Sequence, residues 1–180
     1  MVMNPNLRKF VRTAHVTVTV GWLGAVASFL VLAVTGLTSP DTELVRGAYL
    51  AMDLLTRYLI LPLSLVPLLV TGPLLSLATP WGLFRHYWIV VKLMINILST
   101  LILVVHLQPI SCLAQVAAER TLSSADRGVQ VQLVAAAVAG LLALLVETAL
   151  AVYKLRGLTP YGWRKKNEEL NLSSSSDIST

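Results

Sequence analysis

Four long apolar runs constrain this chain more than any other feature of its sequence. They cover residues 15–40, 58–84, 87–118 and 128–153, and the only formal charges inside them are Lys92 and Glu147. Each run exceeds the roughly 20 residues that a helix needs to cross the hydrocarbon core of a bilayer. The chain is 56% hydrophobic and 13% charged, which leaves too little polar surface for a soluble domain of 180 residues. The sequence therefore predicts an all-α integral membrane protein.

The predicted fold is a four-transmembrane-helix up-down bundle, because short connections favour antiparallel neighbours. We expect its helices near residues 11–37, 48–77, 87–112 and 129–155. Three prolines in the second helix, Pro62, Pro67 and Pro73, predict a kink there. The predicted organisation is a cytoplasmic arm (1–10), a transmembrane domain (11–158) and a partly disordered cytoplasmic tail (159–180).

The distribution of basic residues predicts how the bundle is oriented. Nine Lys and Arg residues lie on the side of the membrane that holds the two termini and the connection between the second and third helices, against four on the other side. This excess places both termini in the cytoplasm. Topology thereby explains the net charge of +5, so we expect the lipid bilayer as a partner and no nucleic acid. The first run is too long for the apolar part of a signal peptide, and we expect it to be retained as a helix.

Lys92 and Glu147 are the first candidates for a functional site, with a catalytic role for both. A charge inside a membrane helix is costly and usually faces a partner or an aqueous cavity. At a rise of about 1.5 Å per residue, both residues lie about 10 Å from the inner boundary. We therefore hypothesise that they contact each other across the third and fourth helices. The alternatives are a purely structural ion pair, or a lysine that reaches toward the inner surface.

Further polar and aromatic residues extend this site into two helical stripes. The stripes consist of Trp88, Lys92, Asn96, Ser99 and His106 on the third helix and of His15, Thr19 and Trp22 on the first. Such an interior can line a cofactor cleft, a proton path or a solute cavity. Trp22, Trp88 and Asn96 are thus candidate cofactor-binding residues.

The three histidines are candidate ligands of heme or a metal. His15 and His106 lie toward opposite leaflets, so we do not expect one heme to bridge them. His15 and His86 match in depth and are the candidate metal ligands, although His86 lies off the Lys92 stripe. A single-histidine site and two separate sites both remain open. Cys112 is the only cysteine, which excludes an intramolecular disulfide and a cysteine-based metal cluster.

Two short motifs carry a family resemblance. The first helix reads His15 followed seven residues later by Trp22-Leu23-Gly24, and the third reads Trp88-Ile-Val-Val-Lys92-Leu before an apolar run to His106. This pair resembles the copper-resistance D-like superfamily of bacterial membrane proteins and is more distantly similar to the HemJ-type protoporphyrinogen oxidases. The resemblance implies a multi-helix bundle in the bacterial inner membrane, whose relatives include heme-b-binding oxidoreductases and proteins linked to copper handling, so heme b is a possible cofactor. It also makes His15 a heme or metal ligand, Lys92 a catalytic or cofactor-contacting residue and His106 a secondary candidate.

Three functions are compatible with these patterns. The first is a heme-binding or redox protein that uses an intramembrane His/Lys site, working as a homo-oligomer or with a membrane redox partner. The second is a structural or accessory membrane subunit with a buried ion pair. The third is a transporter of a metal or small solute with a Lys92–Glu147 charge pair, for which four helices would require an oligomer.

Overall fold

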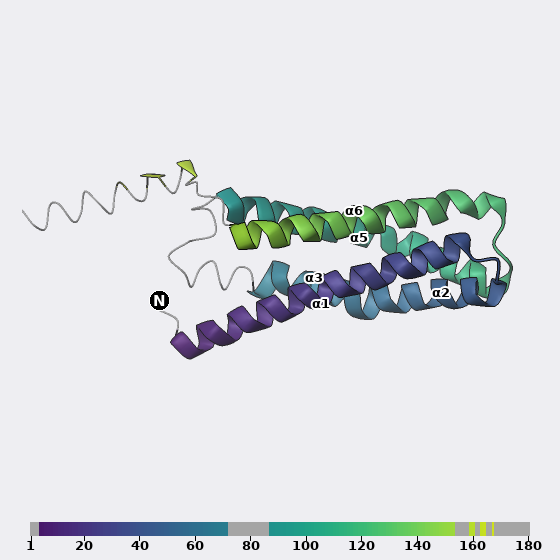
Figure 1. Ribbon diagram of the computed structural model, residues 1–180, viewed down its shortest axis with the longest axis horizontal. Coiled ribbons are helices and arrows are strands. Elements are labelled where there is room, and N and C mark those ends of the chain that lie inside the picture. Colours follow the sequence, from purple (N-terminus) through teal and green to yellow (C-terminus); the bar gives the residue numbers. More distant parts are fainter. Residues whose placement is uncertain (1–3, 72–86, 154–158, 161–162, 165–166, 168–180) are drawn as a thin grey trace, which may run out of the picture.

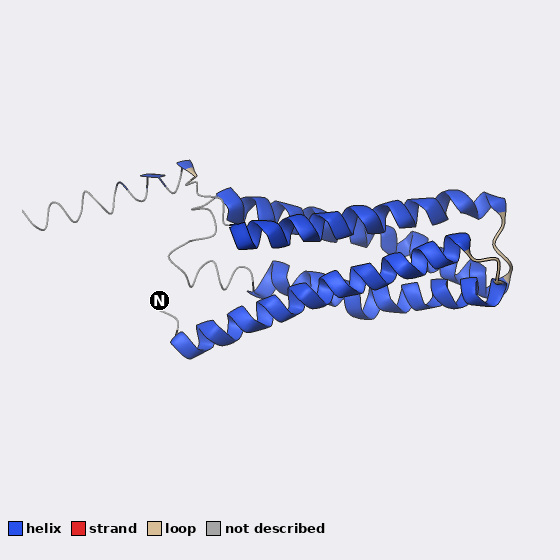
Figure 2. Cartoon of the chain, in the orientation of Figure 1, coloured by secondary structure: helices blue, strands red, loops and turns tan. Residues whose placement is uncertain are grey.

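The computed structural model describes residues 4–71, 87–153, 159–160, 163–164 and 167, and these residues form helices without any strand. Four helical stretches in this part of the chain are long and apolar enough to cross a membrane, which confirms the predicted all-helical membrane class. They run side by side as an elongated bundle (Figure 1 and Figure 2). The elements in chain order are α1 (Pro5–Thr38), α2 (Thr42–Leu55), η1 (Thr56–Ile60), α3 (Leu61–Leu65), η2 (Val66–Thr71), α5 (Tyr87–Glu119), η3 (Ser124–Asp126) and α6 (Arg127–Tyr153).

Local capping explains why two helices begin earlier than predicted. The Asn4 side chain accepts a hydrogen bond from Asn6 N, and Pro5 occupies the first turn, where its missing N–H costs nothing. α1 therefore starts inside the predicted cytoplasmic arm. The Asp41 carboxylate caps α2 in the same way, accepting from the backbone N–H groups of Glu43 (2.9 Å) and Leu44 (3.4 Å). As a result α2 begins at Thr42 rather than near Ala48.

The second membrane-spanning stretch alternates between α-helical and π-helical turns. Its π-helical segments, η1 and η2, flank the short α3, which contains Pro62. The N–H of Leu61 bonds to the carbonyl of Thr56, five residues earlier, because the π turn has absorbed one extra residue. Proline supplies no N–H to the ladder, and such widened turns accommodate it. Pro73 and the predicted end of this helix lie outside the described residues.

The four stretches pack as a ring in which each contacts two neighbours. α1 packs against α2 and α6, and α5 completes the ring by packing against the same two helices. The connections 39–41 and 120–126 lie together at one end of the bundle (Figure 1). α5 continues to Glu119, past its predicted end and through Pro109. Most of the predicted tail, with its proposed disorder, lies outside the described residues.

The buried core is mostly apolar, with a minority of buried polar side chains such as Asn96 and Glu147. Its largest fully buried side chains include Tyr49 and Met52 from α2, Ile110 from α5 and Leu133 from α6. α1 adds Trp22, Phe29 and Ala33. Many large apolar side chains remain exposed on the outer surface, Val105, Leu142 and Val152 among them, as expected where lipid replaces water.

Candidate functional site

An apolar cavity of about 440 Å³ lies between α1, α5 and α6. Its volume falls within the roughly 300–1,000 Å³ typical of small-molecule sites. Two predicted cofactor-binding residues line it, Trp22 from α1 and His106 from α5, together with Ser99 of the same stripe. The remaining wall is mostly aliphatic, and several alanines and Gly140 on α6 keep it open. The structure therefore brings Trp22 and His106 to one cavity.

One ring nitrogen of His106, Nε2, is available to bind a ligand. The other ring nitrogen, Nδ1, lies 2.7 Å from the carbonyl oxygen of Ile102, one turn earlier on α5. A carbonyl oxygen only accepts, so Nδ1 carries the proton and Nε2 of the neutral ring keeps its lone pair. The same second hydrogen bond is characteristic of histidines that ligate metals, because it fixes the tautomer and the ring orientation.

His15, Lys92 and Glu147 form a second, polar cluster toward the end of the bundle that holds the N-terminus. They come from α1, α5 and α6, and Lys92 interacts electrostatically with each of the other two. No hydrogen bond or ion pair joins Lys92 to Glu147, although the side chains of both are described. The hypothesised direct contact is therefore replaced by an electrostatic interaction at longer range. His15 belongs to this cluster and is not part of the cavity wall.

The polar cluster continues into the bundle through buried groups that lack a protein partner. These groups are Trp22 Nε1, Asn96 Oδ1, Thr100 Oγ1 and Glu147 Oε1. A buried polar atom without a hydrogen bond costs about 1–3 kcal/mol, so such sites normally hold water or a ligand group. Thr100 is absent from the predicted stripe, yet Lys92, Asn96 and Thr100 follow each other at i, i+4 and i+8. That spacing alone could have identified it.

The two sites are continuous along α5 and α6. Lys92 lies three residues before the cavity residue Ile95, and Glu147 lies three residues after the cavity residue Leu144. Residues three or four apart share a helix face, so both charges extend the faces that line the cavity. The arrangement is an apolar chamber lined by His106, with opposite charges at the end nearest the N-terminus of the chain.

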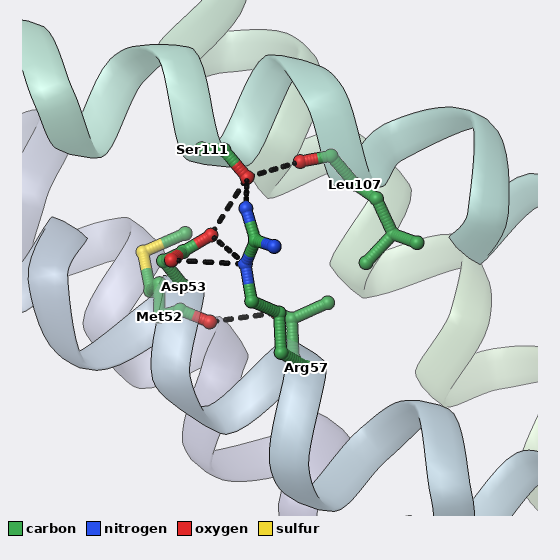
Figure 3. Close-up of polar contacts among 6 residues, drawn as sticks. Met52, Asp53, Arg57, Leu107 and Ser111 are labelled. Carbon is green, nitrogen blue, oxygen red and sulfur yellow. Dashed lines mark hydrogen bonds and ion pairs between the residues drawn. The ribbon is translucent and has the colours of Figure 1, made fainter.

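A third group of polar side chains lies on the α2/η1–α5 interface (Figure 3). Arg57 Nε donates to both carboxylate oxygens of Asp53, at 3.0 and 3.1 Å, and Arg57 Nη2 donates to Ser111 Oγ at 2.6 Å. Ser111 Oγ also lies 2.8 Å from Asp53 Oδ1 and 2.8 Å from the carbonyl oxygen of Leu107. The i, i+4 spacing of Asp53 and Arg57 predicts their salt bridge, whereas Ser111 carries no such signal.

Two predicted residues cannot be placed at the site. His86 lies outside the described residues, and so does the side chain of Trp88, whose backbone belongs to α5. The described residues contain no group of three or more His, Cys, Asp or Glu side chains that could hold a metal ion.

No protein family, curated protein or solved structure matches this chain.

Proposed function

We propose that this chain is an integral membrane redox protein that binds heme b in the cavity between α1, α5 and α6. The single observation that carries the proposal is His106, which lines an apolar cavity and directs its tautomer so that Nε2 is available as a ligand. This site differs from the one implied by the family resemblance, which assigns ligation to His15. The resemblance supports the cofactor class, and the cavity supports its position.

The residues present fit a heme in three respects. The chamber volume and aliphatic wall suit a flat apolar ring. His106 would hold the iron through Nε2, as a proximal histidine does in many heme proteins. Lys92 places a positive charge at the inner end, and this charge favours an orientation with the carboxylate edge of the ring toward that end. A single histidine at this depth also agrees with the prediction that His15 and His106 do not share one heme.

When bound, heme would supply reversible one-electron chemistry at its iron. The chain's own residues would orient the ring, exclude water and balance charge. Ile102 holds the imidazole of His106 in one tautomer, and the aliphatic wall lowers the local dielectric constant. Glu147 and the unpartnered amide oxygen of Asn96 could bind a proton or a water that compensates for an added electron.

In this proposal the bundle spans a bacterial inner membrane in an up-down arrangement with both termini in the cytoplasm. The excess of Lys and Arg in the predicted cytoplasmic segments supports that orientation. The polar cluster of His15, Lys92 and Glu147 then lies in the cytoplasmic half of the membrane. A homo-oligomer or a membrane redox partner would receive the electron.

The test is an ultraviolet–visible spectrum of the detergent-purified protein, as isolated and after dithionite, with iron and copper assayed in parallel. We expect a Soret band that shifts on reduction, with iron present and copper absent. His106→Ala should lose the pigment, while the matched variant His15→Ala should keep it. Pigment loss in His15→Ala alone would indicate that the heme ligand is His15, in the polar cluster with Lys92 and Glu147. A colourless wild-type protein after expression with a heme precursor would reject the proposal.

One observation favours a second function, the transport of a proton or small solute. Lys92, Asn96 and Thr100 lie one above another on α5, and the last two have buried polar atoms without a partner. Such a row can hold a file of water. Flux in proteoliposomes that is lost on Lys92→Met would support this function, and a structural or accessory subunit would show neither pigment nor flux.

A further inference from the structure

A second pocket lies at the opposite end of the bundle from the polar cluster. It has a volume of about 370 Å³ and is formed by the end of α1, the start of α2, the 120–126 connection and the first turn of α6. This is the end where the two short connections meet (Figure 1). Besides five apolar residues, its lining contains hydroxyl, amide and guanidinium groups, unlike the apolar cavity that contains His106; these groups come from Ser39, Thr42, Thr121, Ser123, Ser124, Arg127 and Gln130.

One arginine at this pocket has no carboxylate partner among the described residues. Arg120 and Asp126 neutralise each other through two contacts of 2.9 and 3.1 Å. The Asp41 carboxylate next to the lining residues caps α2. Arg127 lines the pocket and is solvent-exposed, and among the described residues its guanidinium has no acceptor. The formal charges of Arg120, Arg127, Asp41 and Asp126 cancel, and Arg127 is the one of these four side chains that makes no hydrogen bond or ion pair to a described residue.

Gln130 provides the second, independent indication of a ligand. It lies one turn after Arg127 on α6 and is only 7% exposed. Its amide makes no hydrogen bond to any described residue. The amide is not among the fully enclosed polar atoms that lack a partner, so we infer that it reaches the surface of the pocket that Gln130 lines. The Gln130 amide therefore faces the pocket without a protein partner, where a bound acceptor group would receive its N–H.

We propose that this pocket binds a phosphate-type oxyanion. Arg127 would provide the charge and paired N–H donors, Gln130 an amide donor, and Thr42 and Ser124 hydroxyl donors. A planar guanidinium matches the oxygens of phosphate well, and several convergent donors suit a group with several acceptor oxygens. The phosphate could belong to a soluble solute or to a lipid headgroup, because the pocket lies at the end of the membrane-spanning helices.

The experiment uses the full chain purified in neutral detergent. Thermal unfolding is followed with increasing inorganic phosphate, against sodium chloride at equal ionic strength. The same measurement is made in nanodiscs of phosphatidylcholine with and without phosphatidylglycerol, and retained lipid is identified by native mass spectrometry. Arg127→Gln is the test variant, and Arg46→Gln is its matched control, because Arg46 is an exposed arginine on α2 that does not line the pocket.

We expect saturable stabilisation of the wild type, an apparent affinity that falls about tenfold or more in Arg127→Gln, and an affinity within about twofold of wild type in Arg46→Gln. Stabilisation by inorganic phosphate would identify a soluble ligand, and stabilisation by phosphatidylglycerol alone would identify a headgroup. Stabilisation by neither, or equal losses in both variants, would overturn the proposal. Because the readout needs no pigment, it is independent of the heme assignment.

Discussion

Arg57 on η1 donates a 2.6 Å hydrogen bond to Ser111 on α5, and the same serine lies 2.8 Å from the carboxylate of Asp53. The three side chains form a closed triangle that ties the second membrane-spanning stretch to α5 (Figure 3). The Arg57 side chain is half-exposed. Besides Asp53, Ser111 gives its guanidinium a second hydrogen-bond partner. The triangle is the main polar link described between these two helices.

Replacing Ser111 by alanine should weaken that link. The loss of the contacts of Ser111 with Arg57 and Asp53 predicts a destabilisation of about 1 kcal/mol, at the low end of the usual range because Arg57 is half-exposed. The measurement is the unfolding free energy in mixed detergent micelles. Ser28→Ala is the matched control, since the Ser28 hydroxyl bonds only within its own helix, to the carbonyl of Gly24. Equal losses in both variants would mean that the link carries no stability.

Gly36→Ala should destabilise the packing of α1 against α2. A Cβ atom at Gly36 would lie 2.7 Å from Cζ of Tyr49, whose ring is fully enclosed and cannot move aside. We expect a cost of about 1–3 kcal/mol, seen as a lower unfolding temperature. Gly47→Ala is the control, because a Cβ atom there meets nothing within 4 Å. That variant should match or slightly exceed the wild-type stability.

Filling the cavity should reduce pigment binding without unfolding the protein. Ala143 lines the cavity on α6, and Ala143→Leu would occupy part of its volume. The heme content per protein should fall severalfold while the unfolding temperature stays the same or rises. Ala149→Leu, on an exposed part of the same helix, should leave the pigment unchanged. Full heme occupancy in Ala143→Leu would place the cofactor elsewhere.

Lys92 and Glu147 should be energetically coupled even without a direct ion pair. Lys92→Met leaves a 7% exposed carboxylate without its nearby cation, and this single variant should lose more stability than the double variant Lys92→Met/Glu147→Gln. A double-mutant cycle should give a coupling of about 1 kcal/mol. Additive effects would show that the two charges are independent.

The sequence was sufficient for the helices and insufficient for their ends. Long uncharged runs leave a helix as the only way to satisfy the backbone in lipid, so the membrane class followed from composition and length. The starts at Pro5 and Thr42 depend on the side chains of Asn4 and Asp41, which signal a cap but lie outside the apolar runs. α5 passes through Pro109 because a proline interrupts one bond of a long ladder without ending it.

The candidate site likewise depends partly on sequence and partly on packing. The sequence by itself was enough to select Lys92, Glu147, His15, Trp22, Asn96 and His106 as candidates, because polar groups in apolar runs are few and helical spacing assigns them to faces. Only the tertiary structure decided their grouping. It set Trp22 with His106 in the cavity, His15 with the charges, and Ser111 with Arg57. Spacing along one helix fixes a face and a depth, whereas contact depends on how neighbouring helices rotate and cross, and packing of the whole bundle sets that.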